Sequence, residues 1–82
     1  MNKTPQADEI RQYKTSDLDT QIELSFQSLG KLKENPNLTT IEDRNRELWF
    51  EYLNLLLRIA DARPASRFYH WFDKNALDET LG

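Results

Sequence analysis

The stretch of sequence that most restricts the fold covers residues 40–62. As a helix, it places apolar residues over roughly half of its circumference at about 100° per residue, whereas a surface helix needs an apolar stripe of about 100°. Ile41 lies near the centre of this apolar side, and the polar remainder of the circumference includes Glu47, Glu51 and Arg58. One neighbouring helix cannot bury so wide a surface, so we expect 40–62 to be the central helix of the domain.

The segments before and after this helix also carry helical signals. Thr39 and Glu42 have the spacing of a capping box, which predicts a well-defined helix start. Pro64 suits a first helical position and predicts a short third helix over 64–74. An earlier helix is predicted over 17–34, where apolar residues recur at intervals of three and four: Leu18, Ile22, Phe26, Leu29 and Leu32.

These signals predict an all-α fold, in which helices 17–34 and 40–62 form an antiparallel hairpin or small bundle. The prolines stand between the expected helices, and no alternating apolar pattern of strand length occurs. The helix over 64–74 is expected across one end of the hairpin, and a short N-terminal helix could follow Thr4 and Pro5. We therefore expect a loosely ordered segment over 1–15, one helical domain over 16–75 and a tail over 76–82.

Several local features of the hairpin lead to narrower expectations. Ser16 and Asp19 resemble a second capping box, and Gly30 would permit the close approach of another backbone. Leu24 lies away from the apolar stripe of its helix, either as an isolated surface leucine or as a partner contact. Phe50 lies between polar neighbours and is a candidate exposed aromatic residue.

The size of the chain favours self-association. A domain of 82 residues buries only about 60–65% of its unfolded surface, and without cysteine it has no disulfide to stabilise it. We therefore expect the apolar side of 40–62 to serve both the core and a homodimer interface, through Leu48, Trp49, Tyr52, Leu53, Leu55, Leu56 and Ile59.

Aromatic residues are concentrated around residues 68–72. A chain this short has little interior space for so many rings, so some of them are expected to face a partner. Tryptophan, tyrosine and arginine dominate the energetics of protein interfaces. The sequence therefore predicts a surface that binds a larger protein partner, alongside the alternative that these rings only fill the core. The candidate contact residues are Trp71, Phe72, Tyr69, Arg63, Arg67 and Phe50.

A second interpretation concerns the basic groups between residues 58 and 74. Spacings of three and four would align Arg63, Arg67 and either His70 or Lys74 along one side of a helix, within a basic strip from Arg58 to Lys74. Such a strip could contact a nucleic-acid backbone. However, the formal net charge of −3 and the pI near 5.0 differ from those of a dedicated nucleic-acid-binding domain.

Catalytic and metal sites have little support in the sequence. His70 is the single histidine, and Asp73 is its only acidic neighbour at helical spacing, which is a common chance pairing. Glu47 and Glu51 lie one turn apart on an expected exposed face, whereas acid–base catalysis needs carboxyl groups that are buried or closely paired. We therefore predict no catalytic residue, no metal and no cofactor.

Together these expectations describe a small non-enzymatic protein: a regulator, adaptor or inhibitor that binds a larger protein, or alternatively a nucleic-acid-associated factor or a helical subunit of a larger assembly. No apolar run approaches the length of about 18 residues that a membrane span requires, and the N-terminal residues lack the apolar core of a signal peptide. The expected location is the cytoplasm.

Overall fold

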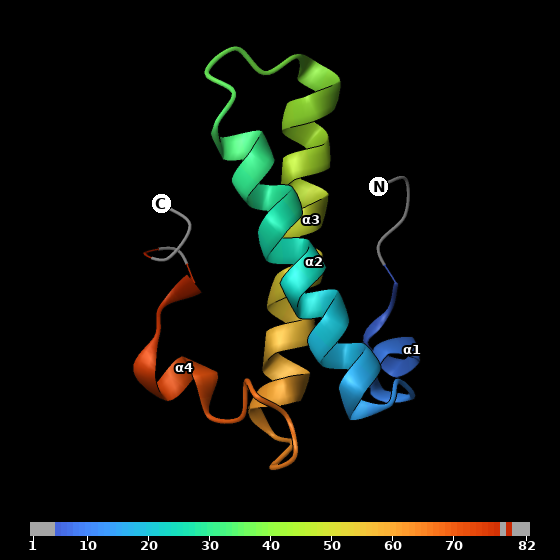
Figure 1. The fold of residues 1–82 in the computed structure, drawn as a ribbon. Coiled ribbons are helices and arrows are strands. Elements are labelled where there is room, and N and C mark those ends of the chain that lie inside the picture. The colour runs from blue at the N-terminus through green and yellow to red at the C-terminus, as the bar shows by residue number, and fades with distance from the viewer. Residues whose placement is uncertain (1–4, 78, 80–82) are drawn as a thin grey trace.

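The computed structural model describes residues 5–77 and 79, and this part of the chain holds four helices and no strand. The long helices α2 (Thr15–Lys33) and α3 (Thr40–Asp61) lie antiparallel and side by side, and α1 (Ala7–Arg11) and α4 (Trp71–Lys74) lie on either side of them near the end of α3 (Figure 1). The predicted all-α hairpin is confirmed, with α3 as the helix that contacts the other three.

The start of α3 confirms the predicted capping box. The Thr39 side chain accepts a hydrogen bond from the Glu42 backbone N–H at 3.1 Å, and the Glu42 carboxylate accepts one from the Thr39 N–H at 3.3 Å. In the preceding loop, the Asn35 side chain accepts a bond from the Asn37 N–H, a turn that asparagine favours. Local side-chain chemistry therefore fixes where α2 ends and α3 begins.

Two expectations for α2 are wrong. The helix begins at Thr15 without a side-chain cap, and Asp19 is buried against residues 66 and 67 instead of returning to Ser16. A Cβ atom added to Gly30 would meet no other atom within 4 Å, so no backbone approaches it closely. Both expectations were drawn from one helix alone, whereas the neighbours of Asp19 come from a distant part of the chain.

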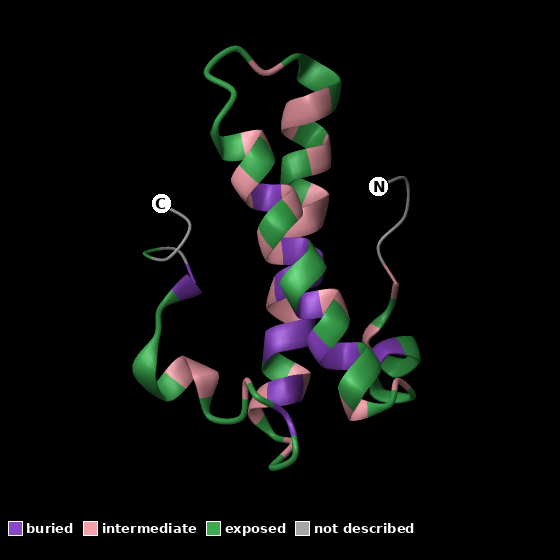
Figure 2. Ribbon diagram, in the orientation of Figure 1, coloured by how far each residue is buried: buried purple, intermediate pink, exposed green. Residues whose placement is uncertain are grey.

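The hydrophobic core lies in the half of the molecule away from the loop between α2 and α3 (Figure 2). Ile10 from α1 is fully buried in it, and Leu77, beyond α4, also belongs to it. No residue between 30 and 51 is fully buried. The core is made of Ile10, Leu18, Ile22, Leu29, Tyr52, Leu53, Leu56, Leu57, Ala60 and Leu77.

The residues predicted to serve the core and a dimer divide into two groups. Tyr52, Leu53 and Leu56 are buried, and they pack in the core together with residues of the other helices. Ile41, which the sequence places at the centre of the apolar side, is 82% exposed. The other four residues predicted to serve the core and a dimer are half-buried: Leu48, Trp49, Leu55 and Ile59.

Tyr52 places a polar atom inside this core. Its hydroxyl donates a hydrogen bond to the Gln21 side-chain oxygen at 3.2 Å, which joins α3 to α2. Burial raises the pKa of the Tyr52 hydroxyl well above its ordinary value. Tyr52 is therefore held protonated in the folded protein.

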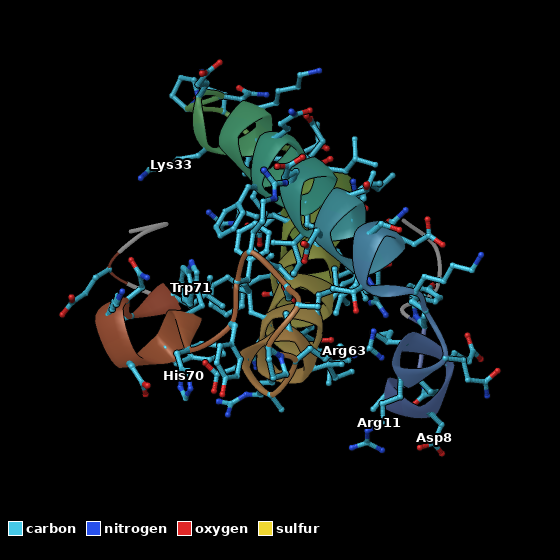
Figure 3. The ribbon with its side chains drawn as sticks, turned by 60° about the horizontal axis from the view of Figure 1, so that its bottom comes forward. Asp8, Arg11, Lys33, Arg63, His70 and Trp71 are labelled. Carbon is cyan, nitrogen blue, oxygen red and sulfur yellow. The ribbon has the colours of Figure 1, made fainter. Side chains whose placement is uncertain are left out.

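The short helix α1 is fixed by Arg63, which follows α3. The guanidinium donates hydrogen bonds to the backbone carbonyls of Arg11 and Tyr13, both at 2.6 Å. Figure 3 shows Arg63 on the side of the molecule that carries α1. Arg63 therefore joins two parts of the fold, and both of these bonds are made within the chain rather than offered to a partner.

The third helix is much shorter than the predicted 64–74, because residues 64–70 form turns. Asp19 accepts hydrogen bonds from the Ser66 hydroxyl and the Arg67 N–H, and the Ser66 hydroxyl accepts one from the Phe68 N–H. His70 adopts the left-handed region with φ 57°, which interrupts a right-handed helix. Side chains satisfy backbone groups that a helix would have paired internally, so α4 begins only at Trp71.

Candidate functional site

A surface hollow lies between α3 and the chain from Phe72 to Leu77. Its volume is about 300 Å³. Three of its lining residues, Phe50, Asn54 and Arg58, are spaced by four and therefore lie along one face of α3. The opposite wall consists of Phe72, Ala76 and Leu77, of which Leu77 also belongs to the hydrophobic core.

Asp61, the last residue of α3, positions the wall that contains Phe72. Its side chain accepts a hydrogen bond from the Phe72 N–H at 3.2 Å, and its backbone carbonyl accepts one from the His70 N–H at 3.3 Å. Residues 64–70 form the turn region between α3 and α4. Together with the hydrogen bonds between Asp19 and residues 66 and 67, these contacts fix both halves of the turn region. Phe72 is therefore placed by the end of α3 rather than by a long third helix.

The hollow combines aromatic and cationic groups. The Arg58 guanidinium lies over the Phe72 ring, 5.3 Å from its centroid, in a cation–π contact. Arg58 is exposed and makes no ion pair with any residue that the structure describes. Because the guanidinium is held over the ring, its N–H groups are available for a carboxylate, and the Asn54 amide lies one turn away.

Trp71 packs between Phe72, which lines the hollow, and Phe26 of α2. Its ring lies 5.1 Å from that of Phe72, almost perpendicular to it at 89°, and 6.1 Å from the ring of Phe26 on α2. Trp71 is half-buried and does not line the hollow itself. Figure 3 shows it where α4 faces the helix pair. Trp71 therefore connects α4 to α2 and holds the Phe72 ring in place.

The predicted contact residues do not all come together. Phe50 and Phe72 line the hollow, and Trp71 lies behind Phe72. Phe50 is half-buried and packs against the core, so the expectation of a freely exposed ring is wrong. Tyr69 is 40% exposed, and its ring is tilted by 60° against that of His70, with centroids 3.9 Å apart. It lines no part of the hollow.

The basic strip expected along the third helix does not form, because residues 64–70 are not helical. Arg63 bonds to backbone carbonyls near α1, whereas Arg67 forms an ion pair with Glu23 on α2 and lies over the Phe68 ring. The His70 Nδ1 atom lies 2.8 Å from an Asp73 carboxylate oxygen. These groups face different parts of the fold, so the cation of the hollow is Arg58.

Asn54, Arg58, Ala76 and Leu77 are lining residues that the predicted protein-binding set lacks. The spacing of four between Phe50, Asn54 and Arg58 indicates from the sequence that they share a helix face. It identifies a site only when the chain from Phe72 to Leu77 is known to lie against that face. Leu24 is 45% exposed and lines no part of the hollow.

Two further findings concern the kinds of site present. Within residues 5–77 and 79, no three His, Cys, Asp or Glu side chains are grouped so that they could hold a metal ion. No helix in this part of the chain combines the length and the apolarity that crossing a membrane requires.

A scan against protein-family models gives no match, and searches of the curated proteins and of the solved structures give none either. The function must therefore be inferred from the side chains of this chain alone.

Proposed function

We propose that this protein is a small non-enzymatic regulator, adaptor or inhibitor that binds a segment of a larger protein in the hollow between α3 and Phe72. The single observation that carries the proposal is the Arg58 guanidinium held over the Phe72 ring in a hollow that presents both aromatic and polar groups. Aromatic rings and arginine at one concave position are the combination typical of protein-interface anchors.

The volume of the hollow favours a peptide side chain over a cofactor. Ligand pockets usually have volumes of about 300–1,000 Å³, so a hollow of about 300 Å³ lies at the lower limit. Phe50, Phe72, Ala76 and Leu77 can contact one apolar side chain, and Asn54 and Arg58 add polar groups to the same lining. A partner would thus insert a single residue rather than a larger group.

The charge of the hollow favours an acidic neighbour to that residue. Arg58 is exposed at the rim, and a carboxylate can bind its N–H groups while Phe72 holds the guanidinium from below. The expected partner segment therefore has a Leu, Ile, Phe or Trp side chain next to Asp or Glu.

Selection of random peptides displayed on phage against the full chain would test this proposal. The selected peptides should share an apolar residue beside an acidic one, and Arg58→Gln should weaken their binding about tenfold or more, because hydrogen bonds to charged groups contribute about 1.5–3 kcal/mol. Phe72→Ala should also weaken it. Arg46→Gln is the matched control, because Arg46 is another exposed arginine of α3 that lies outside the hollow.

Circular dichroism of each variant separates loss of binding from loss of fold. Peptides without an acidic residue, or peptides that bind Arg58→Gln as well as the natural chain, would contradict the proposal. Selection of no peptide at all would also contradict it.

A further inference from the structure

A second face of α3 carries apolar residues that the chain leaves open. Ile41, Leu48 and Leu55 are spaced by seven; Ile41 is 82% exposed, and the other two are half-buried. At about 100° per residue, this stripe lies about 120° around the helix from the face that lines the hollow, and it is similarly far from the centre of the buried face. Leu55 also packs against the edge of the core, and none of the three residues lines the proposed peptide site.

The seven-residue spacing indicates what fits this stripe. Apolar residues at intervals of seven keep a helix surface in contact with a second, nearly parallel or antiparallel helix over several turns. In an antiparallel pair of identical helices with the two-fold axis at Leu48, Ile41 of each copy lies opposite Leu55 of the other. The stripe is thus complementary to itself in shape, as a two-fold interface requires.

Two charged residues beside the stripe distinguish the antiparallel arrangement from the parallel one. Arg44 and Glu51 lie on the same flank, four residues before and three residues after Leu48, and neither pairs with another described residue. In an antiparallel helix pair the same flank of each helix faces its counterpart. Arg44 of each copy then meets Glu51 of the other, which gives two ion pairs of opposite charge.

In a parallel pair, the flank that carries Arg44 and Glu51 would instead face the flank on the other side of the stripe in the second copy. There the corresponding positions are occupied by Asn45, Tyr52 and Ile59, which carry no charge. The distribution of charge therefore complements a second copy of the chain in one orientation only.

We infer that the protein forms a symmetric homodimer through α3, antiparallel about Leu48, with Arg44 of each chain paired to Glu51 of the other. None of the stripe residues lines the hollow, so this interface is independent of the peptide-binding proposal. The contact involves one helix from each chain, so it belongs with the small interfaces, below about 1,200 Å², that are typical of weak association. The dimer should therefore form reversibly as the concentration rises.

Sedimentation equilibrium of the full chain at low ionic strength, from about 10 μM to 1 mM, tests the inference. The natural chain should change from monomer to dimer within this range. Ile41→Lys should weaken dimerisation about tenfold or more while leaving the helical content unchanged, because Ile41 is exposed in the single chain.

Charge reversal tests the orientation. Arg44→Glu alone and Glu51→Arg alone should each weaken self-association, because each places like charges opposite one another. An equimolar mixture of these two variants should form a heterodimer within about threefold of the natural affinity, since opposite charges then meet at both positions. Arg46→Glu, away from this flank, is the control and should dimerise normally.

A natural chain that remains monomeric at the highest concentration would overturn the inference. So would a dimer that Ile41→Lys leaves unchanged, or a mixture of the two charge variants that associates no better than either variant alone. The mixture distinguishes a specific interface from a general effect of charge on the fold, which mixing cannot reverse.

Discussion

Replacing Asp19 with alanine should destabilise the protein by about 3 kcal/mol. Asp19 is 9% exposed, and its carboxylate accepts hydrogen bonds from the Ser66 hydroxyl and from the Arg67 N–H at 3.1 Å. Hydrogen bonds to a charged group contribute about 1.5–3 kcal/mol each, and two that share one carboxylate add to less than their sum. Alanine would leave both donors without their acceptor, and Ser66 is only 6% exposed.

Thermal unfolding followed by circular dichroism measures this loss. For a domain of 60–100 residues, each kcal/mol shifts Tm by about 4–8 °C, so Asp19→Ala should lower Tm by about 12–24 °C. Asp19→Asn should lie between this variant and the natural chain, because its amide oxygen is a neutral acceptor. Asp17→Ala is the matched control: Asp17 is exposed in the first turn of the same helix, where a carboxylate contributes only about 0.3–1 kcal/mol.

A double-mutant cycle with Ser66→Ala isolates the bond between the two side chains. The combined variant should lose less stability than the two single losses together, by about 1 kcal/mol or more. Asp19→Ala with the same Tm as Asp17→Ala would refute the reasoning, because the carboxylate would then contribute nothing to holding the turn region. Full additivity in the cycle would refute the direct contact with Ser66.

Three other substitutions test separate parts of the fold. Gly30→Ala should stabilise the protein by about 0.5–1 kcal/mol, because the added Cβ meets no atom within 4 Å and alanine favours the helix; a lower urea midpoint would contradict this. Arg63→Met should cost about 1.5–3 kcal/mol in urea unfolding through the loss of two carbonyl bonds near α1, and the exposed Arg46→Met less than 1; equal losses would contradict it. The free energy of unfolding should fall as pH rises above about 10, because Tyr52 ionises in the unfolded chain while burial keeps it protonated in the folded one. Tyr52→Phe should reduce this pH dependence. An unchanged pH dependence would contradict the role of Tyr52.

Features that depend on neighbouring residues could be predicted from the sequence. The capping box at Thr39 and Glu42 fixes the start of α3, since both bonds of the box join residues three positions apart. The three- and four-residue spacing in α2 likewise identifies its buried side, which includes Leu18, Ile22 and Leu29. Short-range geometry was sufficient for the helices of the hairpin and for the all-α fold.

The turn region and the candidate site depend on contacts between distant residues. Asp19 bonds to Ser66, 47 residues away, and Arg63 bonds to the Tyr13 carbonyl, 50 residues away. Pro64 and the spacing of the basic residues after it are compatible with a helix. Nothing in the local sequence indicates that hydrogen bonds to Asp19 hold residues 66 and 67 in turns instead. The aromatic residues indicated Phe50 and Phe72 as site residues, but Arg58 could be assigned only once Phe72 was seen beneath it.

The loop end of the hairpin has a dynamic consequence. Because no residue between 30 and 51 is fully buried, the last turn of α2 and the first half of α3 can open while the buried layer around Leu53 and Leu56 stays intact. Their amide protons should exchange with solvent through small local fluctuations, well before those near the centre of the core. Ile41 and Leu48 lie in this readily opened half, so any contact that covers them would slow exchange there first.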